Sequence, residues 1–232
     1  MDIRGKVVLV TGANRGLGKA FVTALLEGGA AKVYAGARDP SSVNIPGSTP
    51  IALDITDQAS VQRAAEHASD VSVVINNAGF LKYGSLLAED SVENLQQHLD
   101  VNTFGTLRVS RAFAPILAKQ GGGALINVLS VLSWLSPPGA GGYSASKSAQ
   151  WGLTNGLRGE LREQGTLVIG VHPAYIDTDM VADVQAPKST PQEVVALTLQ
   201  ALSEDREEVL VSDTSHGVKA SLSSDSPVYL NR

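Results

Sequence analysis

The stretch that decides the fold runs from Lys6 to Gly18 and reads KVVLVTGANRGLG. Residues 6–10 form a short apolar run typical of a strand buried on both faces of a sheet. Three glycines follow, at positions 12, 16 and 18, as a helical pattern begins at Arg15. Glycines between a strand and a helix let the backbone approach a pyrophosphate and direct N–H groups at it. The stretch therefore predicts the dinucleotide-binding turn of an α/β fold, the alternative being a tight turn without a ligand.

The rest of the chain repeats this alternation of short apolar runs and longer helical patterns. Further strands are predicted at residues 32–37, 51–53, 71–75, 124–128, 167–171 and 208–211. Helices are predicted at residues 15–27, 58–68, 92–120, 143–164 and 191–203. Continuous apolar runs joined by crossover helices favour parallel pairing with helices on both faces. We therefore expect an α/β fold, a single doubly wound Rossmann domain over residues 1–232 with a central, mainly parallel seven-stranded sheet flanked by helices.

Within this domain we expect a cofactor half at about residues 1–125, a catalytic and substrate half at about 126–213, and a polar C-terminal tail at 214–232. The net charge of −5 gives no basic footprint, so neither nucleic acid nor an anionic membrane is an expected partner. The chain has no cysteine, which fits a cytoplasmic location, and no apolar run approaches the ~20 residues that span a bilayer. The four histidines are scattered without the paired spacing of a metal site, so no metal is expected.

Tyr143 and Lys147 stand one helical turn apart in YSASK, residues 143–147. Side chains four residues apart project from one face of a helix, which places a cation beside a phenol. A free tyrosine has a pKa near ~10, and a nearby positive charge favours the phenolate. The pair is therefore a candidate for proton transfer at neutral pH, although the same spacing also occurs on solvated helix faces.

Ser130 lies thirteen residues before Tyr143, just after the predicted strand 124–128. The loop 131–142 can return the start of the helix to the end of that strand, so the two hydroxyls can face one small site. Ser133 is the alternative hydroxyl in this loop. Trp134 either contacts the substrate or packs inside the protein, and Trp151 is expected to pack between helices or subunits.

Taken in order, the motifs at residues 11–18, 54–55, 76–79, 102, 130, 143–147, 173 and 178 resemble those of the classical short-chain dehydrogenase/reductase family, over nearly the whole chain. The resemblance implies that Ser130 holds the substrate oxygen and that Tyr143 donates or accepts its proton. It implies that Lys147 grips the nicotinamide ribose while lowering the pKa of the tyrosine. Asn102 would anchor a water that connects the lysine to solvent. The catalytic residues expected from it are Asn102, Ser130, Tyr143 and Lys147.

The resemblance also implies a nicotinamide dinucleotide at the carboxyl ends of the strands. The Asp54 position would hydrogen-bond the adenine amino group, and the turn 76–79 would brace the sheet and line the adenosine side. Asp54 could instead cap a helix or turn, and Asn77 could be a purely structural hydrogen-bonder. The expected cofactor contacts are Gly12, Asn14, Arg15, Gly16, Leu17, Gly18, Arg38, Asp54, Ile55, Asn76, Ala78, Gly79, Tyr143, Lys147, Pro173, Ile176 and Thr178.

The choice between NAD(H) and NADP(H) depends on the end of the second predicted strand. Relatives of the NAD type carry an acidic residue where this chain has Ala37, and Arg38 follows at once. Arg15 lies inside the glycine turn, and two guanidinium groups on one 2′-phosphate would form charge-assisted hydrogen bonds. We therefore predict NADP(H) in preference to NAD(H). Asp39 supports the opposite choice, because a register shift of one residue would bring its carboxylate near the ribose.

These features predict an NADP(H)-dependent oxidoreductase, a carbonyl reductase or alcohol dehydrogenase that interconverts a ketone or aldehyde and an alcohol, with Tyr143 as general acid/base. An apolar pocket is expected, which favours a small ketone or secondary alcohol; its lining would be Leu132, Ser133, Trp134, Leu135, Tyr175 and Met180. The alternatives are a sugar-nucleotide epimerase or dehydratase and a non-enzymatic dinucleotide sensor. A homodimer through residues 103–120 and 142–164 is the first expectation for assembly, and a homotetramer the second.

Overall fold

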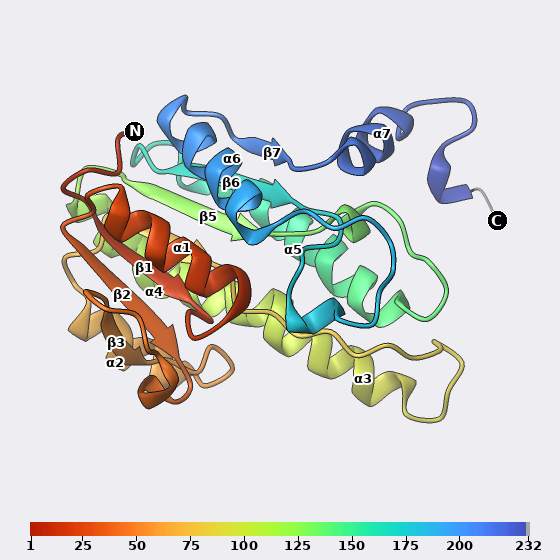
Figure 1. The fold of residues 1–232 in the computed structure, drawn as a ribbon, viewed down its shortest axis with the longest axis horizontal. Helices are drawn as coiled ribbons and strands as arrows, with labels where there is room; N and C mark the ends of the chain where they lie inside the picture. The colour runs from red at the N-terminus through yellow and green to blue at the C-terminus, as the bar shows by residue number, and fades with distance from the viewer. Residues whose placement is uncertain (231–232) are drawn as a thin grey trace.

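A computed structural model describes residues 1–230 and contains a seven-stranded sheet covered by helices on both faces (Figure 1). The sheet order is β3-β2-β1-β4-β5-β6-β7, and every neighbouring pair is parallel. The strands are β1 (Val7–Thr11), β2 (Lys32–Ala37), β3 (Thr49–Ala52), β4 (Val73–Asn76), β5 (Ala124–Val128), β6 (Leu167–His172) and β7 (Glu208–Leu210). The expected fold class is confirmed, with each strand within two residues of its predicted bounds.

Helices pack on the sheet in two layers, each with its own hydrophobic core. One core joins α1 and α6 to the sheet, and the other joins α2, α4 and α5 to the opposite face. The helices are α1 (Gly16–Glu27), α2 (Gln58–His67), α3 (Ser91–His98), α4 (Thr106–Lys119), α5 (Gly141–Glu160), α6 (Pro191–Ser203) and α7 (Asp213–Ser221). In β1, Val8 and Val10 enter the first core and Leu9 the second. A strand that is apolar at every position is thus explained by burial on both faces.

The strand order reverses between β1 and β4, which are neighbours in the middle of the sheet. From β1 the chain builds β2 and β3 on one side and then returns to build β4 to β7 on the other. Open α/β sheets bind ligands outside the carboxyl ends of the strands at such a reversal. The turns that follow β1, β4, β5 and β6 therefore share the edge where the predicted site residues lie.

The single helix predicted over residues 92–120 is wrong in its middle. The structure has α3, then a π-helical segment η2 (Leu99–Gly105), then α4. The wider turn carries the buried Asn102, whose side chain bonds to neighbouring elements, and π-turns often occur at such functional positions. Gly105 completes the segment where space is short, because a Cβ atom there would lie 2.6 Å from Ile55 Cδ1.

Part of the segment predicted as a polar tail, residues 214–232, is helical in the structure. Residues Asp213–Ser221 form α7, which begins with Ser212 accepting a hydrogen bond from the backbone of Ser215. Ser215 and Val218 are buried, and Val218 packs in a third small core with Trp134. The apolar positions are too few to give a helical period in the sequence, which is why the helix was missed. The last two residues of the predicted tail, 231–232, lie outside the described residues.

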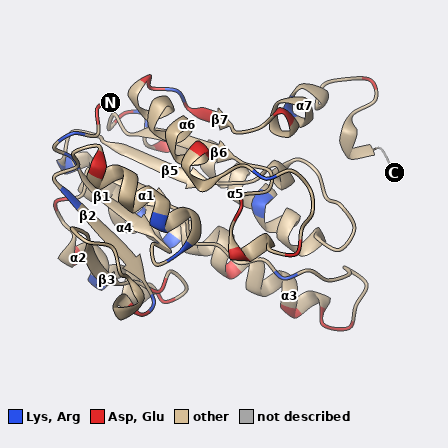
Figure 2. Ribbon diagram, viewed as in Figure 1, with Lys and Arg blue, Asp and Glu red and all other residues tan. Residues whose placement is uncertain are grey.

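Charged side chains of both signs are interspersed over the described part of the chain (Figure 2). Within residues 1–230, no helix is long and apolar enough to cross a membrane. Over the same range, no group of three or more His, Asp or Glu side chains is arranged to hold a metal ion.

Candidate active site

The glycine turn after β1 is locked to the turn after β4 by side-chain hydrogen bonds. Thr11 Oγ1 accepts hydrogen bonds from the backbone N–H groups of Asn77 and Ala78, both at 3.0 Å. Asn77 Nδ2 donates in return to the carbonyl oxygens of Thr11 at 2.9 Å and Gly12 at 3.1 Å. Asn77 therefore has the structural role that the sequence left open.

Close packing within the protein explains two of the three glycines. A Cβ atom on Gly18 would lie 2.1 Å from the carbonyl oxygen of Gly12, and one on Gly12 would lie 2.9 Å from Ala78 Cα. Gly16 has a φ of +52° and faces Thr178 of the loop after β6, whose Cγ2 would lie 3.3 Å from an added Cβ. Arg15, at the N-cap of α1, forms no side-chain capping hydrogen bond. The N–H groups of the first turn of α1 therefore suit a pyrophosphate.

Three of the expected cofactor contacts have side chains turned into the protein. Leu17 and Ile55 are buried in the two hydrophobic cores. Asn76 Nδ2 donates to Asn127 Oδ1 at 2.9 Å and to Ser110 Oγ at 3.3 Å, so this amide joins β4 to β5 and α4. The Asn76 side chain thus braces the sheet as expected for the turn 76–79, and contact of these three residues with a cofactor stays a prediction.

The loop after β6 brings the last predicted residues to the same edge. The Pro173 carbonyl accepts a hydrogen bond from Val131 N at 2.8 Å, and Ile176 forms a β-bridge with Ser189. Thr178 lies against Gly16, so this loop reaches the glycine turn. The remaining candidates, Asn14, Ala78 and Gly79, lie in the turns after β1 and β4.

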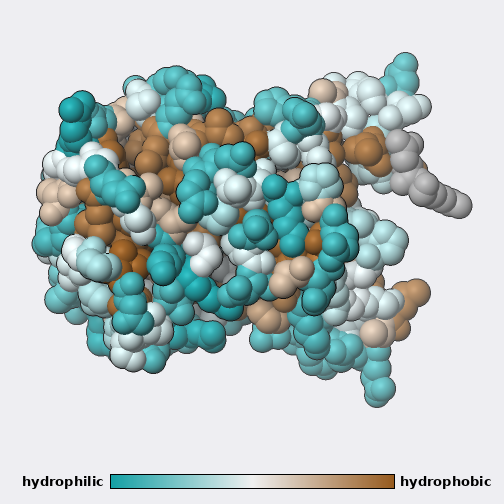
Figure 3. Space-filling view, in the orientation of Figure 1, coloured by the Kyte–Doolittle hydropathy of each residue, from teal (hydrophilic) through white to brown (hydrophobic). Residues whose placement is uncertain are grey.

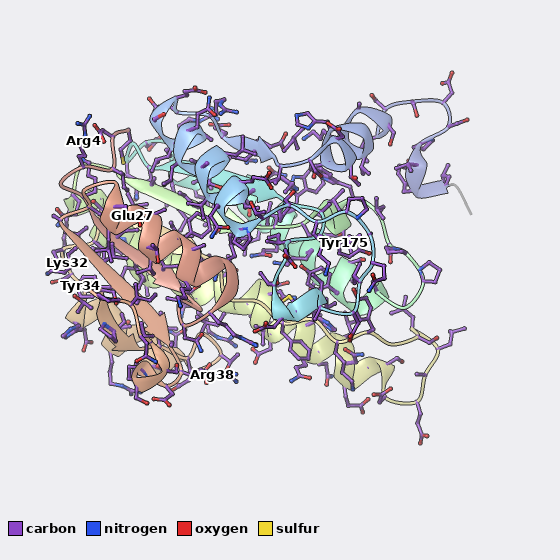
Figure 4. All side chains as sticks on the ribbon, viewed as in Figure 1. Arg4, Glu27, Lys32, Tyr34, Arg38 and Tyr175 are labelled. Carbon is purple, nitrogen blue, oxygen red and sulfur yellow. The ribbon has the colours of Figure 1, made fainter. Side chains whose placement is uncertain are left out.

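At the far end of the site, Arg38 is exposed directly after β2 (Figure 4). Asp54 accepts two hydrogen bonds from Thr56 through Oδ1, at 2.9 and 2.7 Å. Burial opposes ionisation of Asp54, but those bonds and the nearby charge of Arg38 lower its pKa. Asp39 Oδ1 accepts hydrogen bonds from the backbone N–H and the hydroxyl of Ser41, at 2.9 and 2.7 Å. The Asp39 carboxylate therefore caps a short helix.

Ser130 and Tyr143 are brought together at the junction of β5 and α5. Ser130 follows the strand, and its Oγ accepts a hydrogen bond from Leu132 N at 3.1 Å. Burial raises the pKa of Tyr143 to about 12, and a side-chain hydrogen bond with Ser130 opposes this rise. Burial therefore favours the protonated phenol, and the lowering of this pKa by Lys147 stays a prediction.

Lys147 lies beside Tyr143, with its Nζ 5.7 Å from the centroid of the phenol ring. Its ammonium group is buried and donates to the Val128 carbonyl at 2.9 Å and to Gln150 Oε1 at 2.8 Å. Burial lowers the pKa of Lys147 to about 7. The lysine is thus held between the end of β5 and the next turn of α5, with its charge sensitive to small changes around it.

The Asn102 side chain is fully engaged by protein groups. Its Oδ1 accepts from Phe80 N at 2.8 Å, and its Nδ2 donates to the Phe80 carbonyl at 3.0 Å and to Ser146 Oγ at 2.9 Å. Ser146 Oγ donates in turn to the Tyr143 carbonyl at 2.7 Å. The side chain thus joins η2 to α5 beside the tyrosine, and the expected water at Asn102 stays a prediction.

His98 contacts the candidate site, although no role in the site was expected for it. Its ring is buried and lies edge-on to Tyr143, with ring centroids 6.0 Å apart. The ring nitrogens pair with the Asn94 carbonyl at 2.8 Å and Lys82 N at 3.1 Å. Burial, the largest cause, lowers the pKa of His98. In the sequence, His98 could have been found from its position one helical turn before Asn102. Gln150 could have been found in the same way, because it lies one turn after Lys147.

The loop 131–142 turns two of the expected substrate contacts inward. Trp134 is buried against His172 and lies edge-on to Trp151, with ring centroids 6.1 Å apart and ring planes at 87°. Ser133 is buried as well. Trp134 therefore has the packing role left open by the sequence, and the expected pocket loses these two residues. Trp151 packs on Trp134 at the edge of the third core, and its packing between subunits stays a prediction.

Comparison with known proteins agrees with this geometry. A family model described as short chain dehydrogenase matches residues 6–189. The short chain dehydrogenase tazN of Aspergillus terreus is 34% identical over 204 residues, which are 80% of this chain and 44% of that protein. The chain thus spans less than half the length of this relative.

Two solved structures are similar over nearly the whole chain. A short chain dehydrogenase from Burkholderia cenocepacia in complex with NADP is 41% identical with a TM-score of 0.93, covering 97% of this chain and 95% of that one. A short chain dehydrogenase/reductase from Burkholderia phymatum in complex with NAD is 26% identical with a TM-score of 0.84, covering 95% of each chain.

The parallel sheet order and the glycine turn after β1 define a Rossmann-type fold. The chain belongs to the short chain dehydrogenase family.

Proposed function

We propose that the protein is an NADP(H)-dependent oxidoreductase that interconverts a ketone or aldehyde and an alcohol, acting as a carbonyl reductase or alcohol dehydrogenase. The observation that carries the proposal is the grouping of Ser130, Tyr143 and Lys147 at the carboxyl edge of the sheet. When bound, the nicotinamide supplies or accepts the hydride. Ser130 holds the substrate oxygen, and Tyr143 gives it a proton as an alcohol forms.

The protonation states of the site favour reduction near neutral pH. Burial places the pKa of Tyr143 at about 12, so the phenol carries the proton that a carbonyl oxygen requires. Oxidation of an alcohol needs the phenolate instead, so the rate of oxidation should increase as the pH rises. Lys147 stabilises that phenolate when it is charged, which makes its charge state part of the mechanism.

NADP(H) is the proposed dinucleotide because of the residues after β2. Ala37 offers no carboxylate to the ribose, and Arg38 is exposed at the strand end. The carboxylate that favoured NAD(H), Asp39, is engaged with Ser41. Arg15 of the glycine turn lies 3.6 Å from Asp179 at an exposed ion pair, which is weak enough to be exchanged for a phosphate.

The dinucleotide fits the residues that line this edge. The backbone of Asn14, Gly16, Leu17 and Gly18 would hold the pyrophosphate, with Gly12 beneath it. We propose that the adenosine meets Asp54, Ile55, Asn76, Ala78 and Gly79, the last four through backbone atoms. The nicotinamide end would meet Tyr143, Lys147, Pro173, Ile176 and Thr178, with Asn102 fixing the start of α5.

An uncharged, apolar substrate suits the surface beside Tyr143. Leu86 lies against the start of α5, where its Cδ1 would be 2.5 Å from a Cβ on Gly141. Leu86 and Leu87 are exposed, and brown atoms lie at the lower right of Figure 3 in the place of this loop between β4 and α3. Burial and, to a lesser degree, Tyr175 raise the pKa of Tyr83 in the same loop, and Tyr83 adds a little to the rise that burial causes in the pKa of Tyr143. We propose a ketone or secondary alcohol of modest size.

A homodimer is the proposed assembly, with a homotetramer as the alternative outcome. Phe104 near the end of η2 and Leu107 at the start of α4 are exposed apolar side chains on one of the two segments expected to pair. Light scattering of the purified protein decides between monomer, dimer and tetramer.

A panel of aldehydes, ketones and 3-oxo esters, assayed by NADPH absorbance, tests the activity. The variant Tyr143→Phe should lose at least about 100-fold in kcat while it still binds NADPH, because proton transfer typically contributes that much. Tyr229→Phe, at an exposed tyrosine, is the matched control and should keep full activity. Unchanged turnover in Tyr143→Phe would refute this mechanism, and a wild type that binds NADPH without turning over any substrate in the panel would favour a sensor.

A further inference from the structure

Gln150 lies one turn beyond Lys147 on α5 and is enclosed by the protein, with 1% of its surface exposed. Its Oε1 accepts a hydrogen bond from Lys147 Nζ at 2.8 Å. Its Nε2 donates to Thr106 Oγ1, also at 2.8 Å. A buried amide paired at both ends has a fixed position and a fixed orientation.

Thr106 determines which way the amide points. Its hydroxyl donates to the Asn102 carbonyl at 2.9 Å and therefore can only accept from Gln150. The NH₂ group of Gln150 must then face Thr106, and its oxygen must face Lys147. The opposite orientation would set an NH₂ group against an ammonium group, with two donors and no acceptor.

We propose that Gln150 is a positioning residue that keeps Lys147 charged and directs one of its N–H groups toward the phenol of Tyr143 and the cofactor ribose. The ammonium group has three N–H donors. The Val128 carbonyl takes one at 2.9 Å and Gln150 takes the second, which leaves the third for the reaction. This role rests on the proposed function of Lys147, but the charge state of the lysine can be measured without turnover.

The link from Lys147 to the Asn102 carbonyl runs through two side chains, Gln150 and Thr106. The family resemblance implied a water, anchored by Asn102, that connects the lysine to solvent. An amide has no proton that dissociates near neutral pH, so this link holds the lysine rather than passing protons to solvent.

The electrostatic need for such a partner is clear from the surroundings of Lys147. Burial is the resolved cause that lowers its pKa to about 7. The titratable group facing it is Tyr143, with His98 of α3 beyond that ring, and Asp100 of η2 is paired with Arg108 at 2.8 Å. No carboxylate among the described residues bonds to the ammonium, so the oxygen of Gln150 is its main side-chain support.

The experiment compares Gln150→Met with Gln150→Glu in the full chain. Methionine has a similar length without the acceptor, whereas glutamate keeps the acceptor and adds a negative charge. Thr154→Val is the matched control, since Thr154 is buried one turn further along α5 and bonds to Asn127 and to the Gln150 backbone. The readouts are a pH titration of the Lys147 side chain by NMR, assigned with Lys147→Arg, and kcat and KM against pH with NADPH.

Gln150→Met should lower the midpoint of the lysine titration by about one pH unit, because a lost charge-assisted hydrogen bond is worth about a factor of ten. In turnover, kcat should fall about tenfold. The alkaline limb of the profile of kcat against pH should move to lower pH. Gln150→Glu should move both the titration and the limb to higher pH. Thr154→Val should leave both at the wild-type position, whatever its effect on stability.

A folded Gln150→Met protein with the wild-type lysine titration would overturn the inference and leave Gln150 as core packing. If that variant does not fold, an unchanged titration in Gln150→Glu would overturn it equally. A shifted titration in a protein that reduces no carbonyl would support the inference while refuting the proposed function.

Discussion

The indole of Trp134 lies flat on the imidazole of His172, with ring centroids 4.0 Å apart and ring planes at 16°. The stack contacts the candidate site, because His172 Nδ1 is 3.3 Å from the carbonyl oxygen of Ser130. It also meets α7, where Lys219 Nζ lies 5.0 Å from the centre of the Trp134 ring and bonds to Glu208 at 2.8 Å. The C-terminal helix thereby supports the strand end that carries Ser130.

His172 makes the protein sensitive to acid. Its ring is fully buried, and burial, the largest cause, lowers its pKa to about 4 from an ordinary value of 6.5. Between these values the unfolded chain binds a proton that the folded protein does not, so stability falls as the pH drops from 6.5 toward 4. The loss between pH 7 and pH 4.5 should be about 2 kcal/mol, and urea unfolding at these two pH values measures it.

The variant His172→Gln should reduce this pH dependence by the contribution of His172, while the buried His98, whose pKa is also lowered, keeps its own contribution. His216→Gln is the matched control, since His216 is an exposed histidine on α7, and it should keep the acid loss of the wild type. Equal acid loss in the wild type and His172→Gln would assign the effect to other groups.

Trp134 should act through its ring area rather than through its N–H group. Nε1 is buried without a hydrogen-bond partner among the described residues, so Trp134→Phe should cost less than about 1.5 kcal/mol. Trp134→Ala should cost about 3–5 kcal/mol, because a large buried side chain is removed. Thermal or urea unfolding gives both values. A Trp134→Phe protein as unstable as Trp134→Ala would contradict this account.

The sequence predicted what depends on local pattern and failed where distant parts of the chain meet. Continuous apolar strands identified the parallel sheet, and the spacing from Ser130 to Tyr143 predicted two residues that the structure brings together. The inward turn of Trp134 depends on α7, which lies about eighty residues later in the chain. The raised pKa of Tyr143 is likewise a property of burial, which no spacing reveals.

The hydrogen bonds of buried amides could not be predicted from the sequence, for the same reason. Asn76 is expected to contact the cofactor and Asn102 to anchor a water, and neither expectation says which groups the amide side chains bond. These side chains join strands and helices that come together only in the fold. Residue identity alone cannot say which way a buried amide faces.

Gly18 should tolerate no side chain. The Cβ atom of Gly18→Ala would lie 2.1 Å from the Gly12 carbonyl oxygen and 2.6 Å from Asn77 Nδ2. Both neighbours belong to the interlocked turns, so the variant should lose about 3 kcal/mol of stability together with NADPH binding. Gly152→Ala is the matched control within a helix, because nothing lies within 4 Å of its added Cβ. That variant should gain up to about 1 kcal/mol in urea unfolding, and a stable Gly18→Ala protein that binds NADPH would disprove the packing argument.

Arg38 should determine the preference for the 2′-phosphate. A charge-assisted hydrogen bond contributes about 1.5–3 kcal/mol, so Arg38→Ala should raise the KM for NADPH by about 10-fold to 100-fold. The KM for NADH should change little, since NADH has no group for the guanidinium to bind. Asp39→Asn keeps a side-chain oxygen for the Ser41 cap and removes the charge that would repel the phosphate or hold the ribose. If Asp39 only caps, this variant keeps the wild-type KM for both dinucleotides. If Asp39→Asn instead weakens NADH and improves NADPH, the carboxylate faces the ribose, and the preference must be assigned to Asp39 instead of Arg38.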